Sequence, residues 1–150
     1  MTTLIGCSSS VVVEVEPYGS INVAEFSHIL NHKSDYQEFL HDTSPRNYVG
    51  LSLALIQKEH PDAPITRLEY LTIHHDGCAS SRNLDDPTLD RSIAVSFIDP
   101  DSIELIEDTE KARKWRYTRY SANFYFYEDP ESVHRPFYSQ KSQSIHTRNL

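Results

Sequence analysis

The first part of the chain begins with a strand-like pattern and then becomes helical. Residues 11–15 are valines interrupted by one glutamate, a composition typical of a strand. Pro17–Gly19 predicts a turn after that strand. Asn22 and Glu25 have the spacing of a capping box, in which each end of the first turn is hydrogen-bonded by a side chain. A helix is therefore predicted to begin there and to reach about His41, in one piece or as two short helices.

A second helical pattern follows. Ser44 is suited to the cap position and Pro45 to the first helical position, where its missing N–H is not needed. Val49, Leu53 and Ile56 recur at the spacing of one face of an amphipathic helix. Two prolines shortly afterwards prevent this helix from continuing.

The second half of the chain has the composition of strands separated by turns. The predicted strands cover 65–74, 92–98, 103–106 and 113–127, with a long polar loop over 76–91 and turns over 99–102 and 107–110. Residues 65–74 carry apolar side chains on both faces, which predicts a central strand. The expected class is α+β: an N-terminal strand, two or three short helices, then a mostly antiparallel sheet of three to four strands.

Length and composition fit one domain without a stabilising metal or disulfide. The chain has 150 residues, of which 38% are hydrophobic, and apolar side chains become sparse towards its end. We therefore expect a single domain over 1–130 and a loosely ordered tail over 131–150. Cys7 and Cys78 match no disulfide or zinc pattern, so reduced thiols and a cytoplasmic location are expected. No apolar run approaches the roughly 20 residues of a membrane span, so no membrane partner is expected.

Charge is separated along the sequence and directs attention to residues 111–120. The formal net charge is −8, with acidic side chains concentrated in 61–110 and basic ones in 111–150. Basic residues next to aromatic ones can bind phosphates, bases or acidic protein surfaces. The candidate binding residues are Lys111, Arg113, Lys114, Trp115, Arg116, Tyr117, Arg119 and Tyr120.

Strand periodicity divides this segment into two faces. Arg113, Trp115, Tyr117 and Arg119 share one face, and Lys114, Arg116, Thr118 and Tyr120 share the other. An alternative to a binding role is cross-strand pairing of these basic side chains with the acidic side chains that precede them in the chain. Those acids are Glu104, Glu107, Asp108 and Glu110.

A second candidate site lies at the end of the strand predicted over 65–74. His74, His75 and Cys78 follow closely on one another, and an imidazole beside a thiol can activate the thiolate. Successive strand residues point to opposite faces, so only one of His74 and His75 can face the core. No local signature of a cysteine protease or transferase accompanies them.

Histidine content raises the question of a metal, and the pattern does not assign one. His28, His32 and Asp35 would share one face of a helix, but that face is opposite to the apolar one and points to solvent. We therefore predict neither a metal site nor a cofactor.

These observations favour a small binding or regulatory protein over an enzyme. No catalytic signature is present, while charge separation and nine tyrosines suit a surface that contacts a macromolecule. Another protein is the expected partner, as for inhibitor, immunity or anti-defence proteins; the oligomeric state is left open. The alternatives are an enzyme using His75, Cys78 and His74, and a nucleic-acid binder using residues 111–120. The acidic stretch 85–110 also raises mimicry of nucleic acid.

Overall fold

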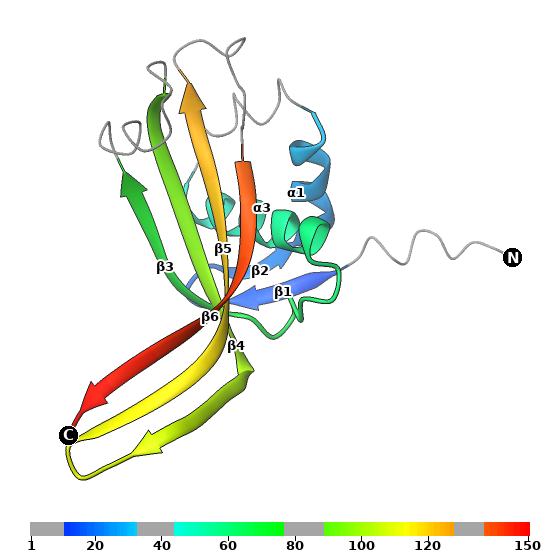
Figure 1. Ribbon diagram of the computed structural model, residues 1–150. Coiled ribbons are helices and arrows are strands. Elements are labelled where there is room, and N and C mark those ends of the chain that lie inside the picture. The colour runs from blue at the N-terminus through cyan, green and yellow to red at the C-terminus, as the bar shows by residue number, and fades with distance from the viewer. Residues whose placement is uncertain (1–10, 33–43, 77–88, 128–136) are drawn as a thin grey trace, which may run out of the picture.

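The computed structural model describes residues 11–32, 44–76, 89–127 and 137–150. The fold is α+β, as predicted, with an N-terminal β-hairpin, two helices and a four-stranded antiparallel sheet (Figure 1). The hairpin strands are β1 (Val12–Val15) and β2 (Gly19–Asn22), and the helices are α1 (Val23–Leu30) and α3 (Pro45–Glu59). The sheet strands are β3 (Glu69–Asp76), β4 (Leu89–Asp108), β5 (Ala112–Tyr127) and β6 (Phe137–Asn149).

The N-terminal hairpin contains the predicted turn and one strand that was not foreseen. Tyr18 donates its backbone N–H to the carbonyl of Val15 at 2.6 Å. Gly19 has a φ of 77°, a conformation that side chains with a Cβ rarely adopt. The chain then returns as β2, with Ile21 opposite Val13, and both side chains are buried. Four residues with glycine and serine gave no strand signal of their own, so β2 depends on its pairing with β1.

Both helices begin at the capping residues indicated by the sequence, and the first helix ends before residue 41. Asn22 caps α1, its Oδ1 accepting the Ala24 N–H at 3.1 Å. The alternative of one continuous helix to about residue 41 is wrong, because α1 ends at Leu30. The alternative of a second short helix is not tested, because residues 33–43 lie outside the described residues. Pro45 opens α3, while Ser44 occupies the cap position without a capping hydrogen bond from its side chain.

Helix α3 lies between the sheet and α1, which accounts for its burial on almost every side. It packs on β4, β5 and β6 on one side and against α1 on the other. Gly50 allows the two helices to approach closely, since a Cβ built there would lie 2.4 Å from the ring of Phe26. The core contains Leu51, Leu53, Leu55 and Ile56 from α3 together with Ile93, Val95, Phe97, Tyr120 and Phe124 from the sheet.

The sheet has the order β3-β4-β5-β6, so the prediction that residues 65–74 form a central strand is wrong. The strand starts at Glu69 and lies at an edge. Its apolar residues on two faces have different surroundings. Tyr70 and Ile73 pack against the core, whereas Leu71 lies at an irregularity between two register pairs and is 43% exposed.

The turn predicted over 99–102 lies within a single long strand. β4 pairs with β5 at Asp99↔Thr118 and next at Glu104↔Arg116, so the intervening β4 residues form a bulge. The Asp99 carboxylate accepts the Asp101 N–H at 3.0 Å, which is the expected turn chemistry. A bulge also accommodates Pro100, which has no N–H to offer a neighbouring strand.

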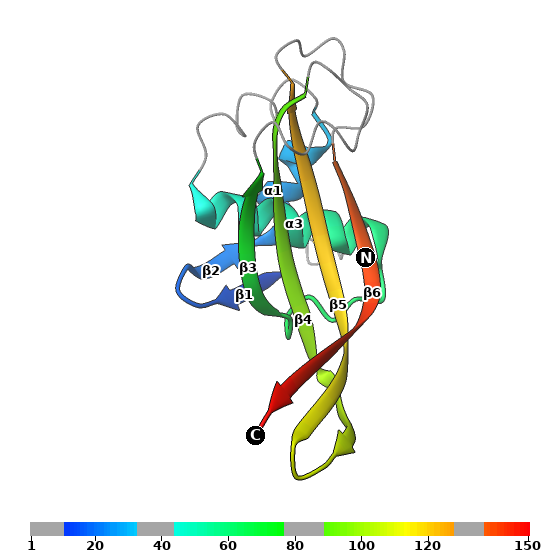
Figure 2. The same ribbon diagram turned by 60° about the vertical axis from the view of Figure 1, so that its left-hand side comes forward.

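Beyond this bulge the sheet continues as a distal arm, which we define as residues 103–117 and 144–150. Figures 1 and 2 show its three strands extending past the helices and twisting away from them. The loosely ordered tail expected over 131–150 is therefore corrected for 137–149, which form β6; residues 131–136 lie outside the described residues. Backbone pairing with β5 from Phe124↔Phe137 to Ala112↔Asn149 holds this polar segment without requiring an apolar sequence pattern.

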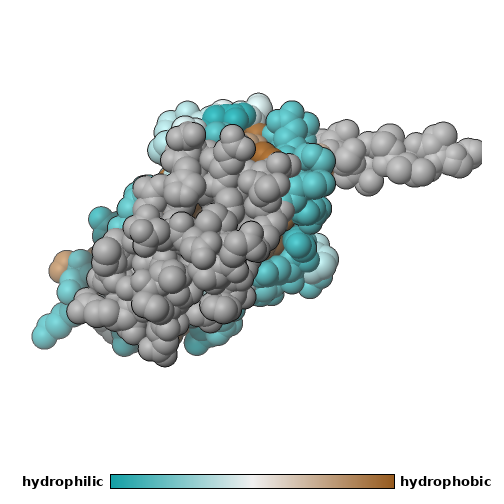
Figure 3. Space-filling model, turned by 90° about the horizontal axis from the view of Figure 1, so that it is seen from above, coloured by the Kyte–Doolittle hydropathy of each residue, from teal (hydrophilic) through white to brown (hydrophobic). Residues whose placement is uncertain are grey.

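The surface seen from the end opposite the distal arm is largely hydrophilic where residues are described (Figure 3). The distal arm itself carries several large exposed apolar side chains: Ile103, Leu105, Ile106, Ile145 and Leu150. In the described part of the chain, no helix has the length and apolar character needed to cross a membrane.

Candidate functional site

An open groove lies on the sheet face that turns away from the helices, where the distal arm joins the rest of the sheet. It has a volume of about 360 Å³ and is mainly apolar. We call it the outer groove. Every sheet strand contributes to its lining, which consists of Leu71, Ile98, Ile103, Trp115, Tyr117, His146 and Arg148.

Strand alternation directs the aromatic side chains of β5 to this face. Trp115 and Tyr117 line the outer groove, whereas Tyr120 points to the helices and is 2% exposed. The predicted division of the segment into two faces is thereby confirmed for these three residues. Trp115 stacks on His146 of β6, with ring centroids 6.2 Å apart and planes inclined by 21°. The positions of Trp115 and His146 in the groove are thus fixed by the pairing of β5 with β6.

The basic residues of β5 are largely paired with acids of β4, as the cross-strand alternative predicted. Arg113 lies 3.2 Å from Asp108. The other two pairs are Lys114–Glu107 at 3.1 Å and Arg116–Glu104 at 2.9 Å. These side chains are roughly half exposed, so each pair contributes at most about 1 kcal/mol to stability. Three of the five basic residues predicted to bind a ligand are therefore already paired with carboxylates within the chain.

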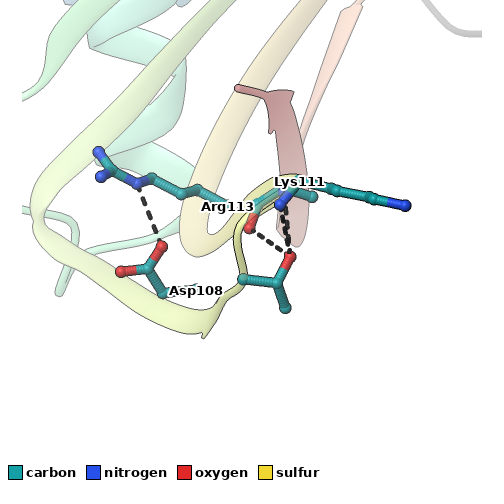
Figure 4. A network of polar contacts seen from close by, with 5 residues as sticks. Asp108, Lys111 and Arg113 are labelled. Carbon is teal, nitrogen blue, oxygen red and sulfur yellow. Dashed lines mark hydrogen bonds and ion pairs between the residues drawn. The ribbon is translucent and has the colours of Figure 1, made fainter.

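The hairpin tip that joins β4 to β5 is ordered by Thr109. Its hydroxyl oxygen accepts the backbone N–H of Lys111 at 3.3 Å and that of Ala112 at 3.0 Å. Figure 4 shows this network beside the Arg113–Asp108 pair, with the Lys111 ammonium directed away from the turn. Lys111 is exposed and lies at the tip, apart from the residues that line the outer groove.

Arg119 is held against the sheet rather than offered to solvent. Its guanidinium donates to Ser96 Oγ at 2.7 Å, and its buried Nε has no hydrogen-bond partner among the described residues. Of the predicted binding residues, Trp115 and Tyr117 therefore line the groove. The others are paired with acids, buried, held to Ser96 or placed at the hairpin tip.

Sequence reasoning missed the groove residues that come from other strands. Leu71 and Ile98 looked like core positions, and His146 and Arg148 fell in the segment predicted to be a tail. Their proximity follows from the pairing of β3 with β4 and of β6 with β5, and the sequence contains no local signal for these two pairings. The sequence feature that could have indicated the groove was the second apolar face of residues 65–74, which includes Leu71.

The structure does not bring the two histidines of the candidate catalytic site to one face. His75 lies opposite the inward-facing Ile93, and its ring meets Tyr48 of α3 edge-on at 6.2 Å. His74 lies opposite Ala94, on the other face. Cys78 lies outside the described residues, so the proposed thiol–imidazole contact is not tested.

Histidines 28 and 32 lie one turn apart on or just after α1, with ring centroids 4.4 Å apart. The His32 Nδ1 is 2.8 Å from the carbonyl of His28. Asp35 lies outside the described residues. In the described ranges, no three His, Cys, Asp or Glu side chains are grouped so that they could hold a metal ion.

Comparison of the chain with models of known protein families found no match. Comparison with curated proteins and with solved structures also found no match.

Proposed function

We propose that the protein is a small binding protein that docks a segment of another protein in the outer groove. The observation that carries this proposal is an apolar, aromatic-lined groove on a sheet face that no described element covers. A soluble domain gains stability by covering such a surface, because each square ångström of apolar area removed from water is favourable.

The position of the apolar side chains supports a docking role over a purely structural one. Leu71 and Ile103 line the groove and are 43% and 44% exposed, although the chain has a large buried core elsewhere. Trp115 and Tyr117, the residue types enriched at the centres of protein interfaces, form one wall. An open groove of about 360 Å³ fits a few side chains of an extended or looped segment.

Nucleic acid is disfavoured as the ligand by the charge arrangement. Arg113, Lys114 and Arg116 are paired with carboxylates, so phosphates would have to displace intramolecular partners. The net charge of −8 also repels a polyanion at long range.

The proposal is tested with a library of random twelve-residue peptides displayed on phage and selected on the full chain. Trp115 is the chain's one tryptophan, so its fluorescence reports groove occupancy directly. Burying a leucine is worth about 1.5–3 kcal/mol, and 43% of Leu71 remains to be buried. Leu71→Ser should therefore weaken binding by roughly 3- to 10-fold.

Val12→Ser is the matched control, because Val12 is a similarly exposed apolar strand residue that does not line the groove. It should leave affinity unchanged. Failure to select any peptide that alters Trp115 fluorescence, or equal losses in both variants, would overturn the proposal.

A further inference from the structure

The distal end of the outer groove carries a positive charge that its neighbours leave unpaired. Arg148 lies directly opposite Arg113 in the pairing of β5 with β6. Arg113 is matched by Asp108 of β4, so the row across the three strands contains two guanidinium groups and one carboxylate. In the described part of the chain, Arg148 has no ion-pair partner. Like charges opposite each other on neighbouring strands are unfavourable, and a further carboxylate would relieve them.

We propose that the segment bound in the outer groove carries an acidic side chain whose carboxylate pairs with Arg148, next to apolar side chains that lie on Leu71 and Trp115. This inference rests on the proposed function. Arginine suits the role because its planar guanidinium binds a carboxylate through two parallel hydrogen bonds. Arg148 also lines the groove itself, so one ligand can reach the cation and the apolar wall together.

The lining gives the ligand a direction. Leu71 lies near the start of β3, where that strand adjoins the distal arm, whereas Arg148 lies near the end of β6, far along the distal arm. The acidic residue of the ligand is thereby placed towards the hairpin tip, and its apolar residues towards the main body of the sheet.

The negative net charge of the chain repels an acidic ligand, and the strength of this repulsion depends on how far the carboxylates lie from the groove. At physiological ionic strength, charges more than about 8 Å apart are largely screened. The repulsion from distant carboxylates is therefore weakened, whereas a carboxylate in contact with Arg148 keeps its attraction. Asp108, the carboxylate in the same cross-strand row, already pairs with Arg113, which leaves Arg148 as the cation to be matched.

The test uses the phage-displayed twelve-residue library, selected on the wild-type chain and on Arg148→Glu. Wild-type peptides are expected to place Asp or Glu beside apolar or aromatic residues and to lose about tenfold in affinity for Arg148→Glu. Lys111→Glu is the matched control: it makes the same change of charge in the distal arm, at a side chain that does not line the groove, and should shift affinity less than twofold. Peptides selected on Arg148→Glu should instead carry Lys or Arg.

A change in the ligand provides a second measurement that does not depend on the variant folding. Replacing the selected Asp or Glu by Asn or Gln should weaken binding to the wild type by a similar factor and leave binding to Arg148→Glu unchanged or stronger. Peptides that depend on Leu71 but show no acidic preference would overturn this inference and leave the proposed function standing. Absence of any groove-dependent peptide would overturn both. Concentration-dependent dimers lost on Trp115→Ala would identify a second copy of the chain as the occupant and overturn the inference.

Discussion

The contact between Gly50 and Phe26 predicts that adding one methyl group will destabilise the protein. Replacing an interior helical glycine by alanine ordinarily stabilises a helix by about 1 kcal/mol. Here the new Cβ would lie 2.4–2.6 Å from three ring carbons of Phe26, whereas unstrained carbon contacts lie at about 3.5–4.0 Å. Phe26 is 4% exposed, so the ring has little room to move, and such overpacking costs about 1–3 kcal/mol.

The unfavourable contact is expected to exceed the gain in helix propensity. Three simultaneous close contacts favour the upper part of that range, so Gly50→Ala should lower the free energy of unfolding by about 1–2 kcal/mol after the helix gain is subtracted. Urea unfolding followed by far-ultraviolet circular dichroism measures this change directly. A higher stability for Gly50→Ala would refute the reasoning.

A double-mutant cycle separates the contact from the helix effect. In a Phe26→Leu background the ring atoms that meet the new methyl group are gone, so Gly50→Ala should become neutral or stabilising by up to about 1 kcal/mol. The coupling energy should then be about 1–3 kcal/mol, as expected for residues in direct contact. Ala54→Gly, a buried position of the same helix, calibrates the intrinsic difference between the two residue types. A coupling energy near zero would show that Phe26 does not restrict position 50.

Three further predictions concern the sheet. Arg116→Ala should cost no more than about 1 kcal/mol in urea unfolding, because the side chains of the Arg116–Glu104 pair are 41% and 59% exposed; a loss above 2 kcal/mol would contradict this. The wild-type chain should bind duplex DNA weakly. The combined variant Glu104→Gln, Glu107→Gln and Asp108→Asn should steepen the dependence of log affinity on log salt concentration by about 3, measured by fluorescence anisotropy. Equal DNA binding by both proteins would refute the pairing of the basic side chains with these acids. Burial, and then the neighbouring phenol of Tyr18, raise the pKa of Tyr70 from 10.0 to about 12. The contribution of the protonated Tyr70 phenol to stability is therefore complete below pH 10 and is lost as the pH rises through 12. Tyr70→Phe should accordingly remove a tyrosine that ionises at about pH 12 from an absorbance titration at 295 nm and reduce the loss of stability above pH 10.

The sequence was informative where the determining contacts are local. The helix α3 follows from Pro45 and from the spacing of Val49, Leu53 and Ile56. The pairing of β4 acids with β5 bases could also be anticipated, because a short turn joins the two strands and brings neighbouring residues opposite each other. Both inferences needed only a periodicity and a turn.

Contacts between distant segments were not accessible in the same way. β6 has a polar composition with one long aliphatic side chain, Ile145, in the distal arm, so no apolar pattern distinguished it from a tail. Its position depends on the free hydrogen-bonding edge of β5, a property of the folded sheet rather than of the residues in β6. The outer groove was missed for this reason, since His146 and Arg148 reach it only after β6 has paired with β5.

The two faces of the distal arm differ in a way that bears on the proposed function. On the face continuous with the helix side, Arg116–Glu104 and Lys114–Glu107 cover the sheet with paired charges, which keep that face hydrated. The opposite face carries Trp115 at the outer groove and an unmatched Arg148. A three-stranded sheet without a covered apolar face is only marginally stable in water. A ligand that covers the outer groove is therefore expected to stabilise the distal arm by mass action. Amide exchange should be faster in the distal arm than in the main sheet, and a bound peptide should slow it selectively in the distal arm.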